Sequence, residues 1–160
     1  AKPPDRRTPF QFVARDARFY GGEAELTLHL LDENERHLHL EFFGDSVRAE
    51  QTGDGTPLPR IPPLRYGTRV TYDDGTWSAG LEARRTNAQN RFTADETATP
   101  GYTLVNANLS YLIPAGRVSY ELFVRANNLG NAIGREHSSF LKDFSPLPGR
   151  GVGAGVRASF

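Results

Sequence analysis

The stretch of sequence that decides the fold is Gly149-Arg-Gly-Val-Gly-Ala-Gly-Val-Arg-Ala-Ser-Phe160. Because a β-strand turns successive side chains to opposite faces, one face from residue 151 onward carries only glycine, arginine and serine. The other face carries Val152, Ala154, Val156, Ala158 and Phe160. A transmembrane barrel strand of about 9–11 residues, apolar only where it meets lipid, fits this pattern and its aromatic end. An ordinary strand of a soluble sheet is the alternative for this segment alone.

The spacing of Val152, Val156 and Phe160 is similar to the C-terminal insertion signal of bacterial outer-membrane proteins. Such a signal implies outer-membrane lipid and the barrel-assembly machinery as partners, and a location in the outer membrane of a Gram-negative bacterium. The chain begins at Ala1 without a leader for export. We therefore expect either a leader that was removed or a piece of a longer protein.

The composition excludes several classes of protein. The chain has 160 residues, at most one domain, and its 19 basic residues balance its 19 acidic ones. A net charge of zero gives no electrostatic basis for nucleic-acid binding, and the absence of cysteine excludes disulfides and thiolate metal sites. No apolar run approaches the length of about 18 residues that a transmembrane helix needs, which leaves barrel strands open.

Strands with alternating faces fill the chain from residue 17 to residue 160, after an N-terminal extended or loop segment over residues 1–16. We expect seven strands, with residues 8–14 as a possible eighth. Short turns at 32–35, 73–75 and 114–116 alternate with longer connections at 51–63, 93–100 and 129–148. This alternation is typical of an all-β, antiparallel transmembrane barrel, here a partial one. The side chains expected on the outer face are Leu26, Leu40, Val70, Leu81, Leu109, Leu122 and Val156, with Glu25, Glu41, Arg69 and Glu82 inside.

Four segments resemble the C-terminal barrel region of TonB-dependent outer-membrane receptors. They are Asp16-Ala-Arg-Phe-Tyr-Gly-Gly-Glu-Ala-Glu25, Leu58-Pro-Arg-Ile-Pro62, Gly101-Tyr-Thr-Leu-Val-Asn-Ala-Asn108, and Asn127-Asn-Leu-Gly-Asn131 with Pro148-Gly-Arg150 and Phe160. Glu136-His-Ser-Ser-Phe-Leu-Lys-Asp143 and Asn87-Ala-Gln-Asn-Arg91 are closer to the zinc-receptor (ZnuD-like) branch. A complete receptor of this family has about 22 strands, a plug and a segment that contacts the TonB complex. The resemblance therefore implies the last third of such a barrel, without its plug.

The histidines are the candidate metal ligands. His29 precedes the first short turn, and His37 and His39 follow it, so antiparallel pairing directs all three inward, with Glu41 as a possible fourth ligand. Polar side chains that line a lumen are the simpler explanation. The resemblance to the zinc receptors adds a separate candidate on the last long loop, namely His137 with Glu136 and Asp143, for which a solvated charge cluster is the alternative.

Catalysis is not expected. The chain has no glycine-rich phosphate loop, no nucleophile elbow and no helical pair of metal-binding histidines. His137, Ser138 and Asp143 supply the atoms of a triad, but they lie on one loop that nothing holds rigid. We expect neither an enzyme nor a bound cofactor.

Three functions remain open. The resemblance implies a barrel segment of an active transporter that imports a metal ion or metal chelate, with zinc as the specific candidate and the TonB complex acting through the plug. The second function is a small, self-contained outer-membrane barrel with a structural or adhesion role. The third is a soluble β-barrel or sandwich that binds a ligand.

Overall fold

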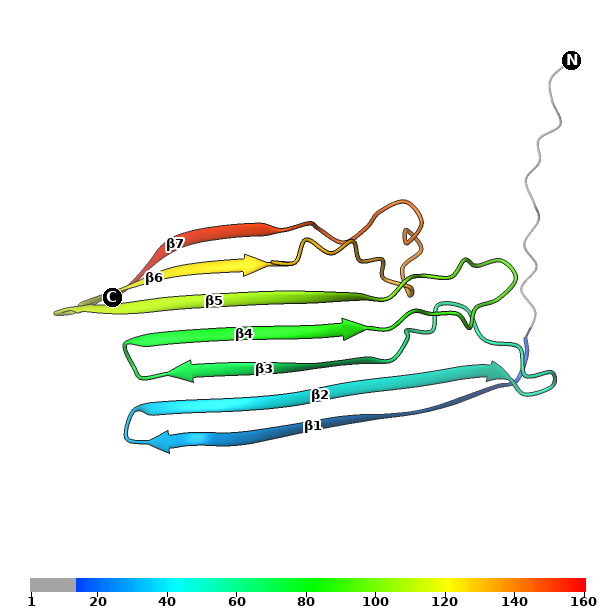
Figure 1. Ribbon diagram of the computed structural model, residues 1–160, viewed down its shortest axis with the longest axis horizontal. Coiled ribbons are helices and arrows are strands. Elements are labelled where there is room, and N and C mark those ends of the chain that lie inside the picture. Colours follow the sequence, from blue (N-terminus) through cyan, green and yellow to red (C-terminus); the bar gives the residue numbers. More distant parts are fainter. Residues whose placement is uncertain (1–13) are drawn as a thin grey trace, which may run out of the picture.

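The computed structural model describes residues 14–160, which form one antiparallel sheet of seven strands (Figure 1). The strands lie side by side in chain order, each paired with the next. They are β1 (Ala17–Glu33), β2 (Arg36–Gln51), β3 (Arg65–Asp73), β4 (Trp77–Thr86), β5 (Tyr102–Ala115), β6 (Val118–Asn127) and β7 (Gly151–Ser159). The expected all-β antiparallel fold is confirmed. The possible eighth strand lies outside the described residues except for Ala14, which is not in a strand.

The described residues include no helix with the length and apolar character needed to cross a membrane.

The three short turns lie at one end of the sheet and the three long connections at the other (Figure 1). Two of the turns are shorter than the sequence predicts. Asp32 and Glu33 belong to β1, and Pro114 and Ala115 belong to β5. Pairing continues to the turn itself because Asn34 adopts a positive φ of 55° and closes the first hairpin within two residues.

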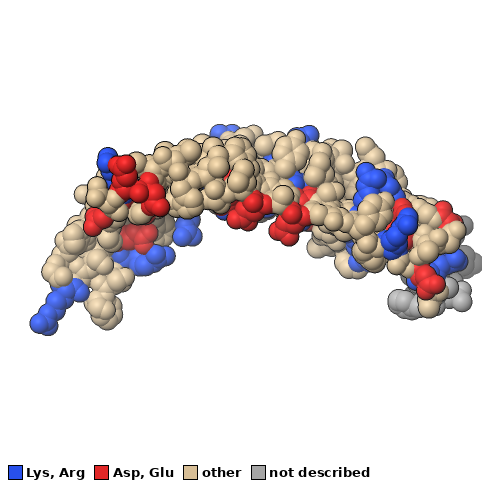
Figure 2. Space-filling model, turned by 90° about the horizontal axis from the view of Figure 1, so that it is seen from below, with Lys and Arg blue, Asp and Glu red and all other residues tan. Residues whose placement is uncertain are grey.

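The two faces of the sheet differ in polarity, and the sheet is curved. Figure 2 shows an arch whose acidic side chains, over its middle, lie on the hollow side. Register places Leu40 beside Val70 and Val70 beside Leu81, while Glu41 lies beside Arg69 and Arg69 beside Glu82. Since each register row occupies one face, the apolar rows form the convex face and the charged rows form the concave face. The predicted outer side chains lie together on the convex face: Leu26, Leu40, Val70, Leu81, Leu109, Leu122 and Val156.

The concave face is held by ion pairs between neighbouring strands. The guanidinium of Arg69 contacts the carboxylates of Glu41 and Glu82 at 2.8 and 2.7 Å. Arg65 and Asp45 form a similar pair at 2.8 Å. These side chains are partly exposed, so each pair contributes little to stability by itself. Their effect is to line the concave face with charge that is already matched.

Glycines on the concave face make room for aromatic rings. A Cβ atom placed on Gly155 would lie 2.6 Å from the ring of Phe123, and one on Gly67 would lie 2.7 Å from the ring of Phe43. In each pair the ring and the glycine are direct partners on adjacent strands. The small residues that the sequence places inside β7 therefore leave room for an aromatic ring from the neighbouring strand.

Few side chains are buried, because a single sheet has no second layer to cover it. The buried residues gather where the long connections fold back onto the strand ends. They are Ala49, Pro63, Thr86, Thr99, Tyr102, Asn128, Gly134, His137 and Lys142.

The sequence predicts that lipid covers the convex face, which gives a direct test of the face assignment. We expect Leu81→Arg to destabilise the assembled barrel by about 2–4 kcal/mol, the cost of a basic side chain at the lipid midplane. Asn108→Arg, on the concave face beside Gly80, is the matched control and should have little effect. Unfolding of the complete barrel in lipid vesicles measures both, and equal stabilities of the two variants would contradict the assignment.

Candidate functional site

The three inward histidines lie together near the turn of the β1–β2 hairpin. His29 and His39 are direct partners in the register, with His29 Nδ1 3.1 Å from His39 Nε2 and ring centroids 4.3 Å apart. The rings of His37 and His39, two residues apart on β2, have centroids 6.3 Å apart. The hairpin therefore gathers three imidazoles on the concave face, and their role as metal ligands stays a prediction.

A β-bulge adds a carboxylate to this group. The register shifts between His29 and Leu31, so Leu30 has no partner on β2 and Leu31 pairs with Leu38. Without the shift, Leu31 would face His37 and the side chain of Asp32 would point to the convex side. With it, Asp32 pairs with His37, and its Oδ1 lies 2.5 Å from His37 Nδ1.

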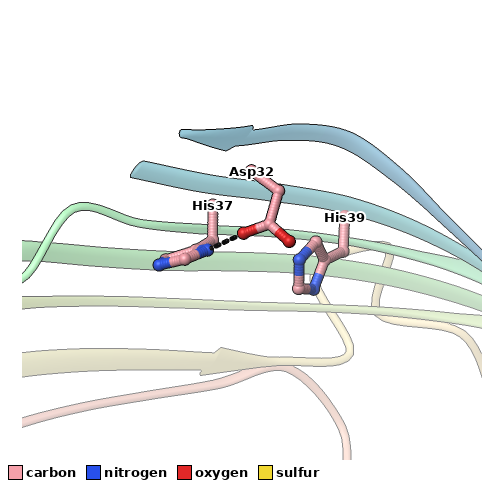
Figure 3. A group of neighbouring side chains, drawn as sticks. All are labelled: Asp32, His37 and His39. Atoms are coloured by element: carbon pink, nitrogen blue, oxygen red, sulfur yellow. Dashed lines mark hydrogen bonds and ion pairs between the residues drawn. The ribbon is translucent and has the colours of Figure 1, made fainter. Parts of the chain in front are cut away.

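Asp32, His37 and His39 form a compact set of potential metal ligands (Figure 3). One ligand atom from each residue lies within 4.8 Å of the other two, and no other such group of three occurs among residues 14–160. The side chains of His37 and Asp32 are 42% and 56% exposed, so an ion has access to them. Glu41, the predicted fourth ligand, is held instead by Arg69.

The sequence pattern does not indicate Asp32 as a ligand, because it places this residue in the turn. The available signal was the pair Leu30-Leu31, which breaks the alternation of β1 just before the turn. Two adjacent leucines in an alternating strand indicate an extra residue.

The second predicted group, Glu136, His137 and Asp143 on the loop over residues 128–150, does not form a compact set of ligands. His137 is only 1% exposed, and its Nδ1 lies 3.0 Å from the hydroxyl of Thr99. The carboxylate of Glu136 accepts a hydrogen bond from Ser138 at 3.1 Å, and that of Asp143 accepts one from Thr97 at 2.7 Å. Each predicted ligand therefore has a partner of its own.

The second ring nitrogen of His137 differs from the first. Nε2 of His137 is buried and has no hydrogen-bond partner among the described residues. Burial lowers the pKa of His137, an effect that Lys142 adds to and that Glu96, Glu136 and Asp143 oppose. The ring is accordingly neutral at pH 7 and keeps a free nitrogen.

The long connections are fastened to one another. Lys142 is 5% exposed, and its ammonium group donates to the backbone oxygen of Thr97 at 2.7 Å. The backbone N–H of Arg60 donates to Glu96 at 3.0 Å, and the guanidinium of Arg60 stacks 3.6 Å from the ring centroid of Phe140. These contacts link all three long connections at one end of the sheet, while Phe140 itself stays 81% exposed.

Comparisons with known proteins give one family model and a similar solved structure. Residues 2–129 match the family model described as TonB dependent receptor-like, beta-barrel. A solved structure titled copper transporter OprC is similar in fold, with a TM-score of 0.77 and 26% sequence identity. The match covers 89% of this chain and 23% of that one, so the chain spans less than a quarter of the length of that transporter.

The buried His137 predicts that acid loosens the loop over residues 128–150. A ring released to solvent has a pKa of about 6.5, whereas the buried ring has a lower one. Stability from the buried neutral ring is therefore present above pH 6.5 and is lost as the pH falls through the lowered pKa. Hydrogen exchange of residues 134–147, corrected for its intrinsic pH dependence, should show less protection at pH 5.5 than at 7.5. His137→Gln should remove this difference, and a wild-type loop equally protected at both pH values would contradict the account.

Proposed function

The chain belongs to the TonB-dependent receptor-like β-barrel family, and we propose that it forms part of the barrel wall of an active importer in a Gram-negative outer membrane. The sequence-based assignment to TonB-dependent receptor barrels is confirmed. The observation that carries the proposal is the likeness to a copper transporter over 89% of this chain. The two faces of the sheet support it, because exposed leucine and valine on the convex face suit lipid and matched charges on the concave face suit a wet lumen.

We propose a metal ion or a metal chelate as the cargo. The chain contains neither cysteine nor methionine, the soft ligands that favour Cu⁺. Its candidate ligands are imidazoles and carboxylates, which suit Zn²⁺ and Cu²⁺. Zinc is the more specific proposal, made from the resemblance of residues 136–143 to the zinc-receptor branch, and copper is the comparison metal that the similar transporter suggests.

The proposed transporter requires a plug and other proteins in addition to this part of the barrel. A plug would bind the TonB complex, which supplies the energy for uptake, and the barrel-assembly machinery would insert the barrel into lipid. The long connections would face outward and the short turns would face the periplasm, as in other outer-membrane barrels. A self-contained barrel with a structural role, or a soluble binding protein, accounts less well for the family match and for the uncovered leucines of the convex face.

His137, Glu136 and Asp143 are the proposed ligands on the uptake side. Nε2 of His137 needs no exchange of partner before it binds an ion, because it has none among the described residues. The carboxylates of Glu136 and Asp143 would leave Ser138 and Thr97 when the loop opens. The loop would then contact the metal only in an open state.

Uptake by cells tests this function. Cells that express the complete receptor should accumulate radioactive zinc or copper, dependent on the TonB complex, and His137→Ala should reduce uptake severalfold. Thr99→Val is the control, since it removes the hydrogen bond to His137 but keeps the ligand. A receptor that raises the uptake of neither metal would overturn the proposed function, and full uptake by His137→Ala would remove the loop from it.

The assembly signal gives a separate test. We propose that Val152 and Val156 on the apolar face of β7, with Phe160 directly after the strand, are recognised by the barrel-assembly machinery, since the two valines are 70% and 64% exposed and Phe160 is fully exposed. Phe160→Asp in the complete receptor should lower the amount assembled in the outer membrane. Ser159→Asp, on the opposite face of β7, should assemble normally. Normal assembly of the Phe160 variant would contradict the signal.

A further inference from the structure

We propose that Asp32, His37 and His39 form a binding site for a divalent transition-metal ion, Zn²⁺ or Cu²⁺, on the lumen wall at the short-turn end of the sheet (Figure 3). This proposal rests on the proposed function, because the site would be a second binding site for the imported metal, far from the long connections. It is separate from the loop of His137, which lies at the other end of the strands (Figure 1).

The distances suit a site that closes on an ion. Zinc binds imidazole nitrogen and carboxylate oxygen at about 2.0–2.2 Å, so tetrahedral ligand atoms lie about 3.3 Å apart. The three atoms here lie within 4.8 Å of one another, and Oδ1 of Asp32 is already 2.5 Å from His37 Nδ1. Binding an ion therefore requires Asp32 Oδ1 and His37 Nδ1 to separate slightly and the wider distances to shorten. Rotation of the side chains, exposed for Asp32 and partly exposed for the two histidines, would supply both movements.

The backbone explains why these ligands converge. His37 and His39 share a face because they are two residues apart on β2, and Asp32 joins that face only through the bulge at Leu30. A strand without the bulge would leave two histidines and no carboxylate. The irregularity of β1 therefore completes the ligand set.

The surroundings favour a cation. The concave-face neighbours that register places beside the cluster on β3 are Thr71 and Asp73, of which one is neutral and the other acidic. Arg69, further along β3, is already paired with Glu41 and Glu82. On the concave face, a positive ion at the cluster thus meets the carboxylates of Asp32 and Asp73 and no basic side chain among the β3 partners of the two histidines. Arg36, in the next register row, belongs to the convex face.

His29 acts as a positioning residue for the site. Its Nδ1 lies 3.1 Å from Nε2 of His39, so one of the two rings donates a hydrogen bond to the other. A partner of this kind commonly orients a metal-binding imidazole and fixes its tautomer. Three protein ligands leave coordination positions for water, which suits an ion that must leave again.

Zinc titration of the complete receptor in detergent tests the site. We expect a calorimetric binding event in the wild type that the double variant His37→Ala/His39→Ala weakens by tenfold or more, and that Asp32→Asn weakens alone. His29→Asn should weaken it by roughly tenfold, the usual effect of losing an orienting partner. In Cu²⁺ spectra this variant should keep the same number of bound nitrogens as the wild type. The control is Glu25→Gln, which removes a carboxylate from the same face of β1 away from the cluster.

Two outcomes would overturn the site. One is equal zinc stoichiometry and affinity in the wild type and the double variant. The other is the absence of an anomalous diffraction peak between Asp32, His37 and His39 in crystals soaked with Zn²⁺. If the double variant does not assemble, Asp32→Asn and the soaked wild-type crystals decide alone.

Parallel uptake measurements separate this site from the proposed function. A receptor that binds zinc at the cluster but imports no metal keeps the site and loses the function. A receptor that imports metal but shows no binding at the cluster keeps the function and loses the site.

Discussion

The register of one continuous antiparallel sheet is the constraint on which the rest of the structure depends. Because side chains alternate with a period of two, pairing Leu40 with Val70 also pairs Glu41 with Arg69, and so assigns both faces at once. A slip of one residue would turn the leucines inward and the charges outward. The ion pairs of Arg69 with Glu41 and Glu82 oppose such a slip on one face, and the packing of aromatic rings over Gly67 and Gly155 opposes it as well.

Among residues 14–160, the one break in this register lies beside the histidine cluster. The bulge at Leu30 turns Asp32 to the concave face beside His37, within reach of His39. At the other end of the strands, the long connections bury His137 and Lys142 and fasten to one another through Thr97 and Thr99. The sheet thus separates two groups of polar residues, one open on the concave face and one closed beneath a loop.

The sequence predicts the regular part of this fold well, because alternation is visible in single residues. Seven strands, their order of short and long connections and the seven outer side chains all follow from it. The side chain of Asp32 does not, since a bulge depends on pairing with a second strand. Nor does the burial of His137, which depends on contacts with Thr99 and on the fold of a loop that has no periodic pattern. The alternation of side chains therefore identifies the two faces of the sheet. The candidate ligand groups depend instead on a bulge and on a loop without a periodic pattern.

The conclusions above depend on the assignment of the convex face to lipid and the concave face to water, which spin labels test most directly. Labels placed one at a time at residues 68–72 and 80–83 of the complete receptor in a bilayer report access to oxygen, which is concentrated in lipid, and to a water-soluble nickel chelate. We expect the two accessibilities to alternate with a period of two, with Val70 and Leu81 exposed to oxygen and Arg69 and Glu82 exposed to the chelate. Uniform access to the chelate on both faces, or protection of both faces, would contradict the assignment.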